Sequence, residues 1–265
     1  MNKIVVTLSL GENYTKDYTL RLIEDVLSLS NMELYITTDC AKVIYNKIGN
    51  NERVKINEIK REDYKISLPI GVNKFSNDFN FNLRHICLLP ILDLDNTIII
   101  FTDCDNSFDW YNEESVDLFI NEQYKRNGYD FFGPRNDYKW VDFLNEYKKN
   151  SDGIFKHKLF NYDLDKSTNN WNNAPLPAEY LLIFVNNNDK LRRFYNQWKY
   201  FYDFLNNKDY TEGTWAEGFE IGVSSLVAGF VPYDIGWNHP LWSKMFVANG
   251  YKSGHRGNIH HKTER

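Results

Sequence analysis

The chain has 265 residues, of which 42% are hydrophobic and 25% charged, and its formal net charge is −5 at pH 7. This composition excludes a wholly disordered chain, because it supplies enough apolar side chains to build a core. The acidic excess argues against a general nucleic-acid binder, which needs a basic surface. The length fits one or two domains, and no repeat or linker divides the sequence into two units.

The cysteines and the apolar runs restrict the class further. Cys40, Cys87 and Cys104 follow no CxxC spacing, which favours a reducing compartment and argues against a disulfide scaffold or a cysteine-rich zinc site. No apolar run approaches the roughly 18 residues that mark a membrane span. The first residues are typical of a strand and not of a signal peptide. We therefore expect a cytoplasmic protein with no membrane span.

The first hundred or so residues alternate between strand and helix patterns. Tyr18, Leu22, Val26 and Leu29 recur at helical spacing, and Asp39 is a candidate cap for a short helix that runs to Ile48. The expected order is a strand at 4–10, a helix through 29, a strand at 32–39, a short helix, a strand in RVKINEI, a buried helix over about 78–94 broken near Pro90, and a strand at 97–103. This order predicts an α/β domain with a parallel sheet.

The second part of the chain continues with mixed elements. We expect a polar helix over about 113–126, a short strand in YDFFGP, a strand at 179–185, and helices over about 189–205 and 215–228. Residues 150–177 form a long polar connection, and a connection of this length is usually functional or mobile. The tail from 233 to 265 is rich in Gly, His, Lys and Arg.

The strongest chemical feature is the acidic pair Asp103 and Asp105, which follows the apolar run TIIIF. Ligands of open α/β sheets bind at strand ends. Two carboxylates on such a turn can hold a hard divalent cation, which then bridges phosphate oxygens. The alternative is a pair of solvated turn aspartates.

The same segment resembles a known family. The strand–helix–strand–helix opening, the helix LRHICLLPIL and then TIIIFTDCD are similar to the nucleotide-binding half of GT-A glycosyltransferases. In that family a DxD motif holds Mn²⁺ or Mg²⁺ on the diphosphate of a nucleotide sugar. EYLLIFVNNNDKLRRFYNQW and WAEGFEIGVSSLVAGF resemble the acceptor-side elements, and GYKSGHRGNIHHK resembles the C-terminal segments.

The resemblance implies one α/β domain over residues 1–265, with a GT-A (Rossmann-like) mixed sheet flanked by helices. Residues up to about 110 would form the nucleotide-binding half, and the rest the acceptor half with the C-terminal tail. Leu8 and Asp39, at the ends of the first two strands, would contact the nucleobase and ribose, and Asp103 would touch the ribose as well as the metal. Arg84 would contact the nucleotide sugar; its alternative is a surface salt bridge.

The tail offers further candidates. His255 stands between glycines that allow close backbone approach, and the resemblance makes it a third metal ligand beside Asp103 and Asp105. Arg256 and Lys262 would stabilise charge on the departing diphosphate. The alternatives are a flexible polar tail and solvated end charges.

Two acids lie three residues apart on a predicted helix. Glu217 and Glu220 therefore share roughly one helix face. One of them would act as the general base for the acceptor hydroxyl or hold the acceptor. The alternative is an exposed helix start, where acids interact favourably with the helix dipole.

The expected activity is Mn²⁺- or Mg²⁺-dependent transfer of a hexose from a UDP- or GDP-sugar to a hydroxyl on a glycan or protein glycan, with no nucleic-acid partner.

One alternative is a haloacid-dehalogenase-like (HAD-like) phosphatase that uses Asp103 and Asp105. However, about a hundred structured residues precede this motif, and we find no later strand ending in paired acids. A sugar nucleotidyltransferase would need a glycine-rich loop near its N-terminus, whereas the first strand here ends in LSLGENY, with one glycine. A carbohydrate-binding protein without activity is the non-enzymatic alternative. The oligomeric state is not predicted.

Overall fold

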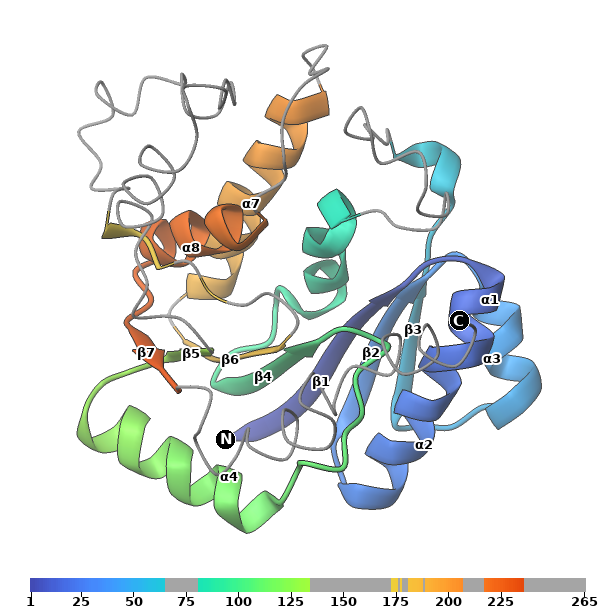
Figure 1. Cartoon of the computed structure of the whole chain (residues 1–265), viewed down its shortest axis with the longest axis horizontal. Coiled ribbons are helices and arrows are strands. Elements are labelled where there is room, and N and C mark those ends of the chain that lie inside the picture. Colours follow the sequence, from blue (N-terminus) through green and yellow to red (C-terminus); the bar gives the residue numbers. More distant parts are fainter. Residues whose placement is uncertain are drawn as a thin grey trace, which may run out of the picture.

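A seven-stranded sheet forms the centre of the described structure (Figure 1). The computed structural model describes residues 1–64, 81–133, 173–175, 177, 181–187, 189–206 and 217–235, with the backbone alone at 81, 82, 204–206, 217 and 219. The strands are Asn2–Ser9 (β1), Glu33–Thr38 (β2), Val54–Glu58 (β3), Thr97–Thr102 (β4), Phe131–Gly133 (β5), Leu181–Asn186 (β6) and Pro232–Asp234 (β7).

The helices of the described residues surround this sheet. They are Glu12–Tyr14 (α1), Leu20–Leu29 (α2), Ala41–Ile48 (α3), Glu113–Ile120 (α4), Lys190–Asn206 (α7) and Glu217–Ala228 (α8). The 3₁₀ helices are Arg61–Asp63 (η2) and Phe81–Ile91 (η3), and the π-helical segments are Thr15–Thr19 (η1) and Asn121–Arg126 (η4).

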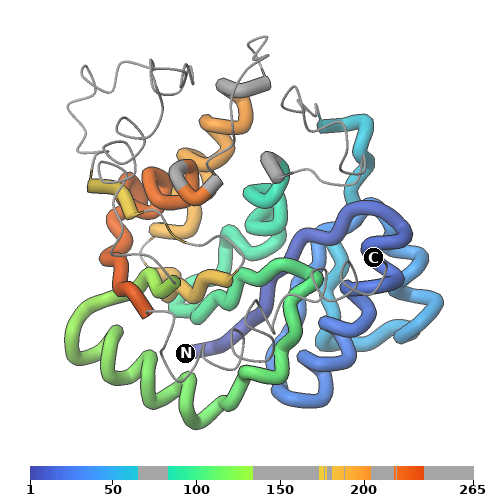
Figure 2. The backbone as a smooth tube through the Cα atoms, in the orientation of Figure 1, coloured from blue at the N-terminus to red at the C-terminus, as the bar shows by residue number. Residues whose placement is uncertain are grey.

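The strand order is β3-β2-β1-β4-β6-β5-β7. The first four of these strands are parallel, β6 is antiparallel to both β4 and β5, and β7 is parallel to β5. Strand β4 joins the parallel and the mixed parts of the sheet, because it pairs in parallel with β1 and antiparallel with β6. The chain enters β4 after η3 and leaves it toward α4 (Figure 2). The mixed α/β sheet that the GT-A resemblance implies is therefore confirmed.

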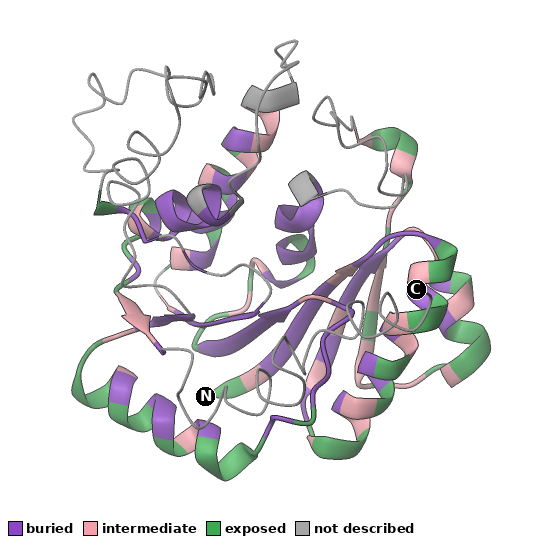
Figure 3. Cartoon of the chain, viewed as in Figure 1, coloured by how far each residue is buried: buried purple, intermediate pink, exposed green. Residues whose placement is uncertain are grey.

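The central strand β4 is apolar along its whole length because both of its faces are covered. All six of its residues are buried. Ile98 and Ile100 belong to one core cluster, and Ile99 and Phe101 to the other, as side-chain alternation along a strand requires. Helices α2, α3 and α4 cover the first face, and η3, α7 and α8 cover the second (Figures 1 and 3). A strand buried on both sides shows a continuous apolar run.

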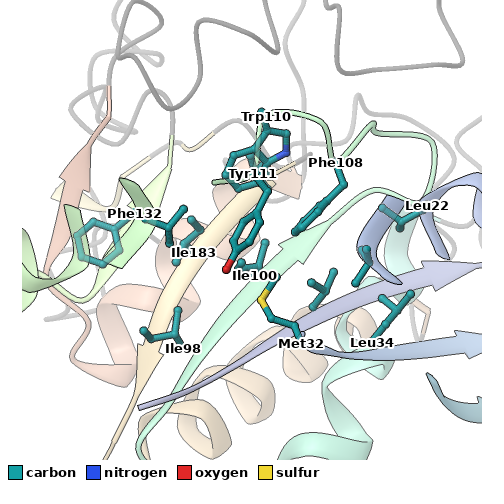
Figure 4. Close-up of a cluster of buried hydrophobic side chains, with 14 of the residues drawn as sticks. Leu22, Met32, Leu34, Ile98, Ile100, Phe108, Trp110, Tyr111, Phe132 and Ile183 are labelled. Atoms are coloured by element: carbon teal, nitrogen blue, oxygen red, sulfur yellow. The ribbon is translucent and has the colours of Figure 1, made fainter. Parts of the chain in front are cut away.

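The segment that follows β4 is anchored in the first cluster. Phe108, Trp110 and Tyr111 lie over Ile100 and Ile183 (Figure 4). The Phe108 and Tyr111 rings stack with centroids 5.0 Å apart. This packing fixes the chain just beyond the acidic pair, so the turn between β4 and Phe108 is held at both ends.

Most elements lie where the sequence predicts them. The buried helix before β4 is a 3₁₀ helix, and Pro90 lies in its last turn, which confirms an end near that proline. The helix after β1 contains the π-helical segment η1, which the apolar spacing did not indicate. The short strand β7 lies in what we expected to be the tail. Its three residues are too few to show an alternating pattern.

None of the described helices has the length and apolar character that crossing a membrane requires.

Helix α8 makes a very close approach to the chain at Pro175. A β-carbon added to Gly222 would lie 1.7 Å from the Pro175 carbonyl oxygen and 2.9 Å from its carbonyl carbon. Backbone atoms cannot move aside as a flexible side chain can. Gly222 therefore allows α8 to pack against this segment.

We expect Gly222→Ala to lower the free energy of unfolding by about 3 kcal/mol, because overpacking forces backbone shifts. Chemical denaturation followed by far-UV circular dichroism measures this loss. Ser224→Ala, two residues along α8, is the matched control, and it should cost about 1 kcal/mol or less. Equal stability of the two variants would contradict the close packing.

Candidate active site at the end of strand β4

The candidate site lies where the strand order changes direction. From β1 the chain builds outward through β2 and β3, and it then returns to place β4 on the other side of β1. Ligands of open α/β sheets bind outside the carboxyl ends of the strands at such a switch point. The segments that leave β1 and β4, with Gly11 and Asp103, meet at this edge.

The acidic pair is held on a tight turn. The Asn106 backbone N–H donates to the Asp103 carbonyl oxygen (3.1 Å), and the Asn106 side-chain amide donates to the Thr102 hydroxyl (2.9 Å). The Thr7 hydroxyl of β1 donates to the Thr102 carbonyl oxygen (2.8 Å). Asp105 is 2% exposed. The alternative of two solvated turn aspartates is therefore wrong for Asp105.

Arg84 faces the acidic turn from η3. Its guanidinium nitrogen Nη2 lies 3.0 Å from Asp103 Oδ1, and the two side chains are 11% and 15% exposed. This is a largely buried ion pair, so the alternative of a surface salt bridge is wrong. The structure brings together Arg84 and Asp103, two of the residues that the sequence singled out.

Tyr14, which the sequence analysis missed, lies against the same turn from α1. Burial, reinforced by the charges around Asp105 and Asp103, raises the pKa of the Tyr14 phenol. The phenol therefore stays protonated and donates a hydrogen bond to the Asp105 carboxylate. Its position soon after Gly11 in LGENY was the only local signal.

Asp39 does not cap α3. That helix has Cys40 at its N-cap position and no side-chain cap. The Asp39 carboxylate instead accepts the Gly11 backbone N–H (2.8 Å) and pairs with Arg61. Gly11 has φ 93°, a conformation that favours glycine. The carboxylate therefore fixes the loop that leaves β1, and Arg61 had no local sequence signal.

The remaining predicted residues are placed less closely. Leu8 is half-buried on β1 and packs against two core clusters. Glu217 begins α8. Glu220 is 1% exposed, so the alternative of an acid at an exposed helix start is wrong for Glu220. His255, Arg256 and Lys262 lie outside the described residues.

A metal at this site would take its protein ligands from few groups. Across the ranges that the structure describes, no three His, Cys, Asp or Glu side chains come together as a metal cluster. The acidic turn supplies two carboxylates, Asp103 and Asp105. Carboxylates suit Mg²⁺ and Mn²⁺, and Mg²⁺ is usually bound by one or two of them together with substrate phosphates. The donor set therefore fits a cation shared with a bound diphosphate.

Searches of protein-family models and of curated proteins find no match to this sequence. Among solved structures, mouse xyloside xylosyltransferase 1 in its apo form is similar, with 11% identity over 88% of this chain and 85% of its own, and a TM-score of 0.45. Core-mannan synthase A from Aspergillus fumigatus, in a manganese and GDP form, has 11% identity over 85% of this chain and 69% of its own, and a TM-score of 0.41. Both neighbours are glycosyltransferases of GT-A-like fold. At this identity and TM-score the likeness assigns no activity to this chain.

Arg84→Gln should lower the free energy of unfolding by about 3 kcal/mol, because it leaves the Asp103 carboxylate buried without its cation. Asp103→Asn combined with Arg84→Gln should cost less than the sum of the two single changes. Urea denaturation without divalent metal measures all three variants. Arg192→Gln is the control, since the Arg192–Asp93 pair has side chains 49% and 93% exposed and should contribute little. A loss no larger than that of the control would contradict the buried pair.

Cys40 provides a test that depends on pH. Burial, with the hydrogen bond and charge of Asp39, raises the pKa of the Cys40 thiol to about 11. Because the thiolate is the reactive form, alkylation by iodoacetamide should rise about tenfold per pH unit and show no plateau below pH 10. Mass spectrometry of the Cys40 peptide gives the rate. A plateau in the alkylation rate near pH 9 would contradict the raised pKa of the Cys40 thiol.

Proposed function

We propose that this chain is a divalent-metal-dependent glycosyltransferase that moves a hexose from a UDP- or GDP-sugar to a hydroxyl acceptor. The observation that carries the proposal is the acidic turn after β4, with Asp103 and Asp105 beside Arg84 at the switch point of the sheet. A carboxylate site repels a diphosphate unless a cation lies between them. The resemblance of TIIIFTDCD to the DxD strand of GT-A enzymes supports the same assignment.

Asp103 and Asp105 would hold Mn²⁺ or Mg²⁺, with His255 proposed as a third ligand. When bound, the cation supplies Lewis acidity that neutralises charge on the departing diphosphate. The protein contributes orientation. Tyr14 fixes the Asp105 carboxylate through its hydrogen bond, and the turn holds Asp103 at the end of β4.

Arg84 provides a fixed positive charge next to the metal position. Its guanidinium balances Asp103, and its several N–H donors can also bind a phosphate or sugar oxygen. Arg256 and Lys262 of the tail are proposed to stabilise the leaving diphosphate. Leu8 and the loop held by Asp39 would line the nucleoside side of the site.

The acceptor would bind on the side of α8. Glu217 begins this helix, and Glu220 is buried within it. We propose that one of these acids orients or deprotonates the acceptor hydroxyl, which fits a glycan or protein-glycan acceptor.

A HAD-like phosphatase is the second candidate for the same aspartates. It would need Asp103 as a free nucleophile, whereas the Asp103 carboxylate is paired with Arg84. Three parallel strands also precede β4 in the chain. A carbohydrate-binding protein without activity would retain the fold but would not need Tyr14 and Arg84 directed at the acidic turn.

The proposal predicts Mn²⁺-dependent hydrolysis or transfer with at least one UDP- or GDP-sugar. Asp105→Asn should reduce the rate by about 100-fold or more, because the cation that stabilises the leaving group loses a charged ligand. Liquid chromatography of released UDP or GDP measures the rate. Asp109→Asn is the control, since Asp109 is an exposed acid four residues further along.

A thermal-shift panel of nucleotide sugars, with and without Mn²⁺, identifies the donor beforehand, since a ligand that binds the native state raises the melting temperature. Wild-type activity in Asp105→Asn would overturn the assignment. Metal-dependent release of phosphate from a phosphomonoester, with no nucleotide-sugar turnover, would favour the phosphatase.

A further inference from the structure

A hydrogen bond from helix α2 holds the chain just after the acidic turn. The Phe108 backbone N–H donates to the Asp25 carboxylate oxygen Oδ2 (3.1 Å), although the two residues are 83 positions apart in the sequence. Phe108 is 0% exposed and follows Asp105 by only three residues. The exit of the turn is therefore held by a side chain that belongs to neither β1 nor β4.

The Phe108 N–H lies in a segment of irregular backbone. No helix or strand runs through residues 103–112, all of which the structure describes. This N–H therefore has no helix or sheet ladder to supply its acceptor. A buried backbone N–H that loses its acceptor is costly. The Asp25 carboxylate provides the acceptor from a different part of the chain.

Asp25 lies at the border of the buried face of α2. Leu22, three residues earlier, and Val26, the next residue, are 0% exposed and belong to the same core cluster as Phe108 (Figure 4). Asp25 itself is half-buried. Because residues three apart on a helix share a face, the packing of α2 on the core brings this carboxylate to the exit of the turn.

Ring packing alone would not fix the direction of the backbone at the exit. The Phe108 ring stacks on Tyr111 and lies edge-on to Trp110, with centroids 5.0 and 5.4 Å apart. Apolar burial has no preferred direction, whereas a hydrogen bond does. The bond to Asp25 therefore selects one orientation in which the backbone leaves the turn.

The two ends of the acidic turn are held from different elements. At the entry, the Thr7 hydroxyl of β1 donates to the Thr102 carbonyl oxygen (2.8 Å). At the exit, Asp25 of α2 accepts from Phe108. Residues 103–107, with both aspartates, lie between these two bonds. The entry bond joins two paired strands, but the exit bond does not, so it can be removed without changing a strand.

We propose that Asp25 is a positioning residue, whose carboxylate sets where Asp105 stands by holding the exit of the acidic turn. It acts through the Phe108 backbone and needs no contact with a ligand. Loss of the carboxylate would leave β4 and its core packing in place and would release the turn at one end. The consequence for metal binding rests on the proposed function, whereas the ordering of the turn does not.

Two substitutions of Asp25 test the acceptor oxygen. Asp25→Ala removes it and keeps α2 helical, because alanine favours helices. Asp25→Asn keeps an oxygen that can accept from the Phe108 N–H. Asn112→Ala is the matched control, since the Asn112 side chain also accepts a backbone N–H, that of Ser115 (2.9 Å), at the start of α4. Asp25→Ala and Asn112→Ala should lower the melting temperature of the full chain by similar amounts, about 3 °C.

Amide hydrogen exchange without metal reports the turn through the Asn106 N–H, which donates to the Asp103 carbonyl oxygen (3.1 Å). The Phe108 amide is not the reporter, because losing its acceptor changes its own exchange. We expect the Asn106 amide to exchange about tenfold faster in Asp25→Ala, since the turn opens locally. Asp25→Asn and Asn112→Ala should both keep the wild-type rate.

Nuclear magnetic resonance spectra resolve this amide. An unchanged Asn106 rate in Asp25→Ala, or an equal rise in Asn112→Ala, would overturn the positioning role. An equal rise in Asp25→Asn would show that the charge of Asp25 matters and its acceptor oxygen does not, which would also overturn it.

Titration with Mn²⁺ alone, followed by electron paramagnetic resonance, tests the functional consequence. We expect the dissociation constant of Asp25→Ala to rise about tenfold, as for groups that orient metal ligands from behind. Asp25→Asn should match wild type. If Asp25→Ala loosens the turn but wild type binds no Mn²⁺, the positioning role is supported and the proposed function fails. If wild type binds Mn²⁺ and Asp25→Ala binds it equally well, the positioning of the metal ligands is overturned.

Discussion

The site depends on the parallel pairing of β1 with β4. Val5 lies opposite Ile100 and Val6 opposite Phe101, so both strands end at the same edge. Because every residue of β4 is buried, this pairing cannot slip without moving isoleucines out of both core clusters. The apolar core therefore determines where the two aspartates stand, although neither aspartate belongs to it.

Charge at this edge is balanced locally. Arg84 faces Asp103, Arg61 faces Asp39, and Tyr14 donates to Asp105. Buried carboxylates are costly without such partners. Each of the three acids therefore has a cation or a hydrogen-bond donor as its partner, although the chain as a whole has a net charge of −5.

Local patterns in the sequence were enough to predict most of the sheet. The run TIIIF predicted a strand at 97–103, and the acids that follow it were expected at a strand end. The helical spacing of Leu22 and Val26 likewise predicted α2. These features depend on neighbours in the chain, so the sequence carries them directly.

The partners of the acids could not be predicted in the same way. The sequence predicted Asp39 as a helix cap. In the structure its two carboxylate oxygens instead bind the Gly11 N–H and the Arg61 side chain, which come from two other segments. Tyr14 lies on the three-residue helix α1, immediately before a π-helical segment, and neither element leaves a periodic apolar pattern in the sequence. Such contacts arise from the packing of distant segments.

The most direct test of the account is anomalous scattering from a crystal of the protein soaked with Mn²⁺ and UDP or GDP. The account predicts a manganese peak within coordination distance of the Asp103 and Asp105 carboxylates, with the diphosphate on its other side. A nucleotide bound elsewhere, or bound at this edge with no manganese between it and the two carboxylates, would contradict it.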